Sequence, residues 1–271
     1  MPIDLKAYTG RIEHESELAP NLATLQALHL AHATHITFEN LDVLMGKPIR
    51  LDLESLAAKL IQGGRGGYCF EQNALFAGAL EEIGFRVTRL AARVRMGSRK
   101  ITPRTHMLLV VDIAGECYIA DVGFGDEGLL LPIPLRIDQP TTQFSWTYRI
   151  VTDGPFHVLQ SRRSDEWLDL YAFTLEEAHP VDYEVANYYI STHPHSPFVH
   201  RIFVARPGAD VRYALMNRRL IERRPDSTSE MILTDDDAVL EVLAERFGLR
   251  FPAGTRFIYA DDASGSEMLS H

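Results

Sequence analysis

The sequence predicts an α+β protein made of several packed units. Three observations support this: helical spacing of apolar residues in the first third, short β-rich runs between turns in the middle, and an N-capped helix near the C-terminus. The chain has 271 residues, of which 46% are hydrophobic, so two or three units around a real core are expected. We place the units at residues 1–85, 86–195 and 196–271.

The first unit is expected to be helical and the second to be an antiparallel sheet. Apolar residues recur at helical spacing in residues 17–36, 51–60 and 74–83. The pattern then changes to short runs rich in Val, Ile, Leu and Tyr, such as Met107–Ile113 and Cys117–Val122, separated by Gly and Pro. Such runs are typical of strands joined by tight turns.

The third unit is expected to mix strands with one helix. Strand-like runs occur at residues 157–160, within the second unit, and at residues 198–205. Thr234 and Asp235–Asp237 precede an apolar-periodic run that Gly248 ends. A capping residue, acidic residues in the first turn and a terminal glycine together indicate a helix.

Charge and composition exclude several classes of partner. The 27 Lys and Arg residues against 37 Asp and Glu residues give a net charge of −10, which argues against nucleic acid or an anionic membrane as the main partner. The longest apolar stretches fall short of a spanning helix, and Pro132 and Pro134 interrupt the best of them. Residues 1–30 lack the pattern of an export signal. We therefore expect a cytoplasmic protein.

Cys69 is the most informative residue of the chain. The two cysteines, Cys69 and Cys117, provide no disulfide framework. Gly66 and Gly67 permit a tight bend before Cys69, and the following residues form a good helix that Gly84 ends. A thiol in the first turn of a helix is stabilised as the nucleophilic thiolate. The alternative is that Cys69, like Cys117, is a small buried apolar residue.

His106 and Asp121 are the candidate base and its orienting acid. If Ala114-Gly115 is a two-residue hairpin loop, Ile113 pairs with Glu116 and His106 falls opposite Gly123. Asp121 then shares the face of His106 as its diagonal neighbour, within reach of a hydrogen bond. A three-residue loop would place them on opposite faces. The alternative is that both are ordinary polar residues at strand ends.

Two further patterns resemble ligand sites, but their surroundings in the sequence do not support them. The segment Gly123–Gly128 matches a dinucleotide-binding fingerprint, but no helix can follow it, and Asp126 and Glu127 would repel a pyrophosphate. The histidines at residues 29, 32 and 35 share part of one helix face, yet no further ligand completes a set. We expect neither a Rossmann fold nor a metal site.

Four segments together resemble arylamine N-acetyltransferases of the bacterial type. They are FENLDVL at 38–44, RGGYCFEQN at 65–73, TH at 105–106 and ADVGFG at 120–125. The resemblance implies a helical domain, a β-barrel-like domain and an α/β lid around a core like that of papain-like proteases and transglutaminases. It also implies a triad of Cys69 as nucleophile, His106 as base and Asp121 as orienting acid.

The implied reaction is a ping-pong acetyl transfer through an acetyl-cysteine. Acetyl-coenzyme A would donate the acetyl group, and arylamines, arylhydrazines or N-hydroxyarylamines would accept it on nitrogen or oxygen. The resemblance implies no permanently bound cofactor and no metal, and a monomer or homodimer. Rival hypotheses are an amide synthase, a transglutaminase-like thiol hydrolase with the same triad, and a coenzyme-binding or scaffolding protein with an inert thiol.

The resemblance also assigns contacts to the two substrates. Its acceptor contacts are Phe38, Phe124 and Tyr189. We also expect Gly123, Gly125 and Thr105 to contact the coenzyme and the positive charge of Arg104 to meet its phosphates, the alternative being that Arg104 lies in a solvated loop. Glu39 and Arg65 resemble a structural pair near the site. Asp126 stands where the family usually has glycine, and Thr37 where it usually has proline. We expect Asp126 to place a carboxylate beside the acetyl donor and to alter coenzyme affinity or donor choice.

Overall fold

The computed structural model describes residues 2–260. Its helices are α1 (Leu5–Arg11), α2 (Leu22–His35), α3 (Leu41–Leu44), α4 (Leu53–Leu56), α5 (Cys69–Ile83), α6 (Pro180–Thr192) and α7 (Asp236–Phe247), with a π-helical segment η1 (Ala57–Gln62) and a 3-10 segment η2 (Pro197–Val199). Its strands are β1 (Phe38–Glu39), β2 (Arg86–Val94), β3 (Arg104–Ile113), β4 (Glu116–Ala120), β5 (Ile133–Pro134), β6 (Thr141–Gln143), β7 (Trp146–Asp153), β8 (Phe156–Arg163), β9 (Glu166–Glu177), β10 (Phe203–Arg206), β11 (Arg212–Met216), β12 (Arg219–Arg224) and β13 (Ser227–Ile232).

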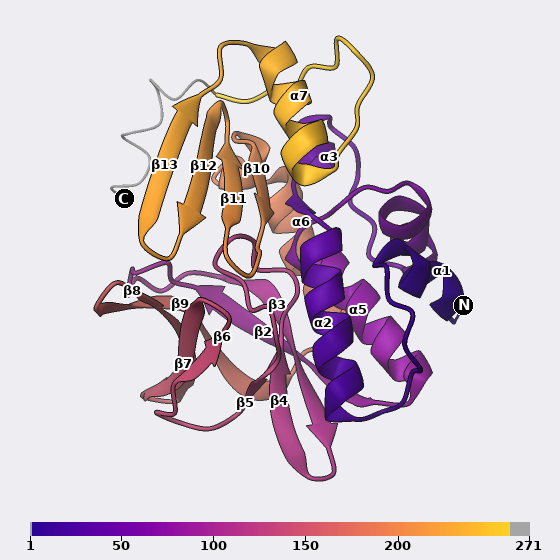
Figure 1. The fold of residues 1–271 in the computed structure, drawn as a ribbon, viewed down its shortest axis with the longest axis vertical. Helices are drawn as coiled ribbons and strands as arrows, with labels where there is room; N and C mark the ends of the chain where they lie inside the picture. The colour runs from indigo at the N-terminus through magenta and orange to yellow at the C-terminus, as the bar shows by residue number, and fades with distance from the viewer. Residues whose placement is uncertain (1, 261–271) are drawn as a thin grey trace.

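The helical region is built around α5, with α2 beside it (Figure 1). The α5 helix begins at Cys69, as predicted, and Glu71 accepts a hydrogen bond from the Tyr68 amide at 3.0 Å. It ends at Gly84, whose φ of 104° is left-handed and favours glycine. This start and stop fix the position of Cys69 at the edge of the helical region.

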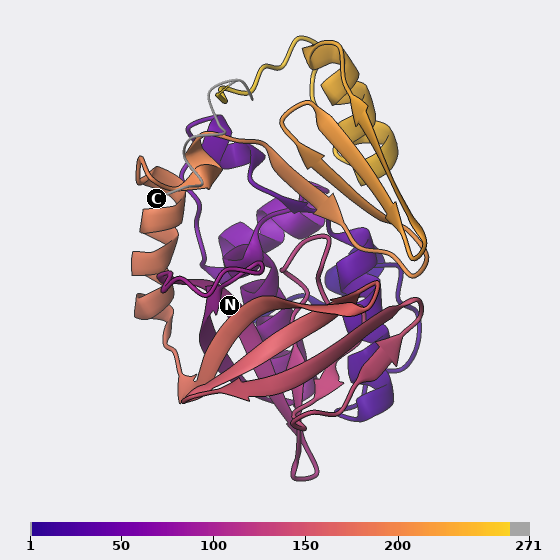
Figure 2. The same cartoon turned by 90° about the vertical axis from the view of Figure 1, so that its left-hand side faces the viewer.

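An eight-stranded antiparallel sheet, curved like a barrel, forms the middle of the fold (Figure 2). Its strand order is β5-β4-β3-β2-β9-β8-β7-β6. The β3–β4 hairpin has the predicted two-residue loop: Ile113 pairs with Glu116, and Ala114 and Gly115 have φ of 53° and 86°. These positive values match the twist of a tight hairpin, so the predicted register is confirmed.

A second sheet, of order β1-β10-β11-β12-β13, packs with α7 over the other two regions (Figure 2). Its first strand, β1, comes from the N-terminal third, where Phe38 pairs with Ala205. The prediction of a strand at residues 198–205 is partly wrong. Residues 197–199 form η2, with Ser196 as its N-cap and Pro197 in its first position, and β10 begins at Phe203.

The remaining differences concern helix ends and helices without a predicted counterpart, namely α1, α3 and α6. The α7 helix is capped by Asp235, which accepts from the Ala238 amide at 2.9 Å, and not by Thr234. The α6 helix was not expected, since its apolar residues lie on both faces: Val185 and Tyr188 are exposed while Ile190 is buried. The α+β fold class is confirmed, and the unit boundaries remain predictions. In residues 2–260 no helix has the length and apolar content to cross a membrane.

Candidate active site

The Cys69 thiol is buried at the start of α5 and points toward β3. Its Sγ lies 3.6 Å from the Thr105 carbonyl oxygen. The two glycines before it are required by close packing. A Cβ on Gly66 would lie 1.9 Å from the Thr37 carbonyl oxygen, and one on Gly67 would lie 2.7 Å from the Glu71 carboxylate. The glycine bend thus holds Cys69 close to β1.

His106 and Asp121 meet as the hairpin register predicts. Nε2 of His106 lies 2.7 Å from Oδ2 of Asp121, and both side chains are at least 98% buried. Burial lowers the pKa of His106, but the Asp121 carboxylate and the Cys69 thiol outweigh it and raise that pKa to about 10. Although burial raises the pKa of Asp121, the imidazolium keeps it below its ordinary value. The site therefore favours the charged form of His106, with Asp121 as its counter-ion.

Asn73 positions Asp121 and was missed by the sequence analysis. Its Nδ2 donates to Oδ1 of Asp121 at 2.9 Å and to the Met107 carbonyl at 2.7 Å. Its Oδ1 accepts from the Val122 amide at 3.1 Å. Asn73 follows Cys69 by one helical turn and so shares its face of α5. That spacing was the available signal for a third polar group at the site.

Aromatic rings enclose the His106 imidazole. The centroid of Phe124 lies 5.0 Å from it, edge-on, and that of Tyr171 lies 4.8 Å from it. Phe124 is only half-buried, so part of its ring is open to a ligand. Tyr171, which the sequence analysis missed, is fully buried, and burial and the Asp121 charge raise the pKa of its phenol well above 10. Its neutral ring shields His106 from water.

The glycines after Asp121 allow the loop to approach the thiol. A Cβ on Gly123 would lie 2.8 Å from Cα of Cys69, so any larger residue would displace the helix start. Gly125 has a φ of 87°, and a Cβ there would lie 3.8 Å from the Phe38 ring. The fold therefore gathers a large part of the predicted site around Cys69: His106, Asp121, Gly123, Phe124, Gly125 and Phe38.

Of the three remaining predicted contacts, Thr105 lies at the thiol, whereas Arg104 and Tyr189 have other partners. Thr105 contributes its carbonyl oxygen to the Cys69 thiol. Arg104 is exposed and forms an ion pair with Glu176 at 2.9 Å. Tyr189 is half-buried on α6 and stacks on His193, with the ring centroids 4.5 Å apart. The substrate contacts of these three residues remain predictions.

Glu39 and Arg65 form the predicted pair. Nε of Arg65 donates to Oε1 of Glu39 at 2.9 Å, and Nη1 contacts Asp42 at 3.2 Å. Glu39 is fully buried and also accepts from the Leu41 amide at 2.8 Å. The pair ties β1, which carries Phe38, to the segment that leads into Cys69.

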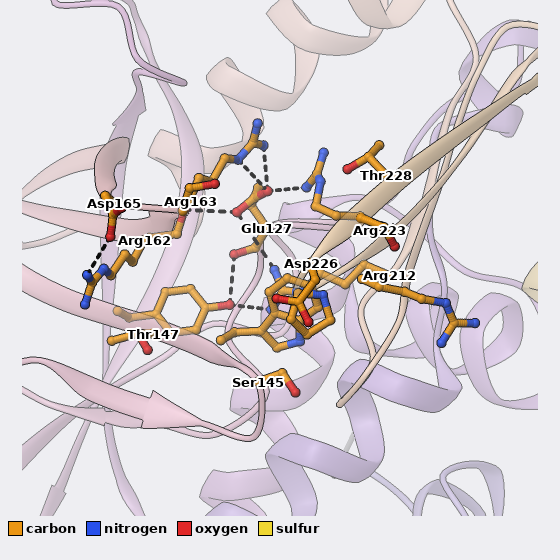
Figure 3. A pocket seen from close by; sticks show the side chains of 17 residues that line it. Glu127, Ser145, Thr147, Arg162, Arg163, Asp165, Arg212, Arg223, Asp226 and Thr228 are labelled. Atoms are coloured by element: carbon orange, nitrogen blue, oxygen red, sulfur yellow. Dashed lines mark hydrogen bonds and ion pairs between the residues drawn. The ribbon is translucent and has the colours of Figure 1, made fainter.

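Glu127 lies in an arginine cluster between the two sheets (Figure 3), and Asp126 precedes it in the chain. Arg223 contacts Asp126 at 3.0 Å and also pairs with Glu127. Glu127 further accepts from Nη2 of Arg163 at 2.6 Å, and its side chain is 5% exposed. Burial and the neighbouring Glu127 raise the pKa of Asp126. The Asp126 carboxylate is thus an internal partner of Arg223; its expected effect on the coenzyme remains a prediction.

All three clustered histidines have structural partners, and that of His35 is the Ala31 carbonyl, 2.8 Å from its Nδ1. His29 Nδ1 contacts the Leu130 carbonyl at 3.0 Å, and its Nε2 accepts from the Asp121 amide at 3.0 Å. His32 Nδ1 contacts the Tyr8 hydroxyl at 2.9 Å. Among residues 2–260 no group of three His, Cys, Asp or Glu side chains is arranged to hold a metal ion. Because Nε2 of His29 accepts the hydrogen bond of the Asp121 amide, it is the neutral form of His29 that supports this backbone.

His29 is expected to make the protein labile to acid. Burial lowers its pKa to about 4, against an ordinary value near 6.5. Between these values the unfolded chain binds the proton and the folded chain does not, so stability falls by about 3 kcal/mol as the pH drops from about 6.5 to 4. The glutamine of His29→Gln can make both hydrogen bonds but does not titrate. This fall in stability between about pH 6.5 and 4 should therefore be absent from the variant.

Urea unfolding of wild type and His29→Gln at each pH would measure this contribution. Glu71, whose pKa burial raises to about 7, acts in the opposite direction, so the informative quantity is the difference between the two proteins. The exposed His195 provides a control variant, His195→Gln. A difference between His29→Gln and wild type that does not change with pH would contradict the expectation.

Comparisons with known proteins agree with this geometry. A family model described as N-acetyltransferase matches residues 21–255. The arylamine N-acetyltransferase of Mycobacterium tuberculosis is 41% identical over 257 residues, covering 92% of this chain and 90% of that protein. The arylamine N-acetyltransferase / N-hydroxyarylamine O-acetyltransferase of Salmonella typhimurium is 36% identical over 248 residues, covering 90% of this chain and 88% of that protein.

A solved structure shows the same fold. The Mycobacterium marinum arylamine N-acetyltransferase in complex with CoA superposes with a TM-score of 0.87 at 39% identity, covering 90% of this chain and 92% of that one. The family match, the relatives and the superposition each extend over most of the chain. The chain therefore belongs to the arylamine N-acetyltransferase family of enzymes.

Proposed function

We propose that this enzyme transfers an acetyl group from acetyl-coenzyme A to arylamines, arylhydrazines or N-hydroxyarylamines through an acetyl-Cys69 intermediate. The observation that carries the proposal is the buried contact of His106 with Asp121 at 2.7 Å beside the Cys69 thiol. The names of the relatives support arylamines and N-hydroxyarylamines as acceptors, and the CoA complex of the Mycobacterium marinum enzyme supports the donor.

In the first half-reaction the Cys69 thiolate attacks the acetyl carbonyl carbon. The thiolate is paired with the His106 imidazolium, whose charge Asp121 stabilises. The carbon–sulfur bond to coenzyme A then breaks, and the leaving thiolate takes the proton of His106. The first amides of a helix have no intrahelical acceptor, so we assign the Cys69 N–H as one donor to the developing oxyanion.

In the second half-reaction the acceptor nitrogen or oxygen attacks the acetyl-Cys69 carbonyl. The neutral His106 accepts the proton that the acceptor loses, and Cys69 leaves as the thiolate. The half-buried rings of Phe38 and Phe124 lie beside the thiol and would hold a flat aromatic acceptor. We assign Tyr189 a more distant acceptor contact, and Gly123, Gly125, Thr105 and Arg104 contacts with the coenzyme.

The intermediate can be tested without any acceptor. Incubation with acetyl-coenzyme A is expected to leave one acetyl group on Cys69, because the thiolate needs only His106 and the donor. Intact-protein mass spectrometry with peptide mapping would locate it. Cys117→Ser should still be acetylated and Cys69→Ala should not. Acetylation of Cys117 alone, or of neither thiol, would argue against the mechanism.

The same sample separates a transferase from a hydrolase. Acetyl-Cys69 should persist in buffer and disappear on addition of an arylamine, hydrazine or hydroxylamine, with formation of the acetylated acceptor. Equal decay with and without acceptor would indicate that water is the natural acceptor. We further propose that the enzyme acts in the cytoplasm on small molecules, with no permanently bound cofactor.

A further inference from the structure

A cleft that Cys69 does not line lies between the barrel-like sheet and the C-terminal sheet (Figure 3). Its volume is about 720 Å³, which suits a ligand the size of a nucleotide. The hairpin ends of β6–β7, β8–β9 and β12–β13 form its walls. None of the proposed triad or coenzyme contacts lines it, so it is distinct from the site already described.

The cleft is rich in arginine although the chain is acidic. Five arginines line it, at residues 162, 163, 212, 223 and 224, together with three carboxylates, Glu127, Asp165 and Asp226. This leaves two surplus positive charges in a chain whose net charge is −10. Asp126 and Glu222 lie behind the wall as partners of Arg223 and Arg224, and counting them balances the five arginines with five carboxylates. An anion would therefore be held by guanidinium groups that exchange their present carboxylate partners for it, and not by a surplus of positive charge.

The arginines fall into an inner and an outer group. Inner Arg212 is 99% buried, and Arg223 is held by Asp126 and Glu127. Outer Arg162 and Arg224 are about half-exposed and pair with Asp165 at 3.2 Å and Glu222 at 2.7 Å. Ion pairs of exposed side chains exchange readily. The outer arginines are therefore available to a ligand, whereas Arg212 and Arg223 keep the cleft in shape.

The floor of the cleft contains an aromatic ring and a buried N–H donor that has no hydrogen-bond partner among residues 2–260. The guanidinium of Arg212 lies 4.1 Å above the Trp146 ring and donates to the Tyr148 hydroxyl at 2.5 Å. Its Nε is buried without a hydrogen-bond partner in residues 2–260. Buried donors are normally satisfied, so this group is suited to an acceptor oxygen from outside. The hydroxyls of Thr147, Ser164 and Thr228 add further donors along the walls.

We propose that this cleft binds a phosphorylated anion of nucleotide size, with Arg162 and Arg224 contacting its phosphate groups. Guanidinium groups match phosphate oxygens in pairs, and the walls supply hydroxyl donors. The ligand is either the nucleotide end of a coenzyme or an independent phosphorylated molecule. Both present the same chemistry to the arginines.

Trp146 provides a local probe of occupancy. The chain has two tryptophans, and Trp167→Phe leaves Trp146 as the single reporter. Titration with pyrophosphate and with adenosine 3′,5′-bisphosphate should change its fluorescence in a saturable way. The dissociation constant should rise about tenfold or more in Arg162→Ala/Arg224→Ala, and also at high salt. The control Arg86→Ala/Arg136→Ala removes two exposed, paired arginines elsewhere and should bind as wild type does.

Acetylation of Cys69 distinguishes the two sources. If adenosine 3′,5′-bisphosphate competes with acetyl-coenzyme A, but not with the phosphate-free donor 4-nitrophenyl acetate, the cleft holds the nucleotide end of the coenzyme. Binding without competition identifies an independent phosphorylated ligand. No saturable change in Trp146, or equal affinities in the two double variants, overturns the proposal. Reaction with 4-nitrophenyl acetate tests the thiol separately, so failure of the cleft and failure of the acetyl transfer are distinguishable.

Discussion

Asp121→Asn is expected to lower the rate of Cys69 acetylation by roughly 10³- to 10⁴-fold while the fold is retained. Oδ1 of Asp121 accepts from Asn73 and from the Gly123 amide, so the oxygen of an asparagine would take this position. The amide nitrogen would then face Nε2 of His106 and donate to it. This forces the imidazole proton onto Nδ1, the nitrogen left to serve Cys69, and removes the base.

The variant should also shift the pH dependence. Asp121 is the largest of the causes that raise the pKa of His106 to about 10, and burial opposes it. Without the carboxylate the pKa of His106 falls, and the thiolate loses its counter-ion. Single-turnover acetylation followed by mass spectrometry from pH 5 to 9 would measure both effects. Asp112→Asn, half-exposed on β3 and paired with Arg86, is the control.

An Asp121→Asn rate within tenfold of wild type, in a protein with unchanged circular dichroism, would remove Asp121 from the mechanism. A large loss in Asp112→Asn would show instead that charge on β3, and not the imidazole tautomer, controls the rate.

The local parts of the site could be predicted from sequence. The bend before Cys69 defines the start of α5, and Gly84, with its left-handed φ of 104°, defines its end. Ala114-Gly115 fixes the β3–β4 register, which brings together two residues fifteen positions apart. These predictions succeeded because each depends on a turn or cap within a few residues.

The supporting residues could not be predicted in the same way. His29 meets Asp121 across 92 positions and Asn73 meets it across 48, and no periodicity encodes such contacts. Glu127 illustrates the limit. From sequence it is a carboxylate that would repel a pyrophosphate, whereas the fold buries it against arginines of β8, β11 and β12. Its role depends on tertiary packing that brings the two sheets together.

Glu127→Gln is expected to lower the free energy of unfolding by about 3 kcal/mol or more. Removing one member of a buried ionic cluster leaves its partners uncompensated, at a typical cost of 3–5 kcal/mol. Here Arg163, Arg212 and Arg223 would lose their shared carboxylate, and Arg212 is 99% buried. Glutamine keeps the volume, so loss of charge and not a cavity is the cause.

Ionisation of Asp126 should limit the loss of stability in Glu127→Gln, and it should make the stability of this variant depend on pH. Glu127 helps to raise the pKa of Asp126. Without Glu127 the neighbouring arginines should hold that pKa below its ordinary value, so the stability of the variant should recover as the pH rises and Asp126 ionises. Urea unfolding against pH would show both effects. Glu222→Gln, which breaks only the exposed pair with Arg224, should cost about 1 kcal/mol or less. Equal losses in the two variants would mean that Glu127 is no more than a surface partner, and that the two sheets are joined by apolar packing alone.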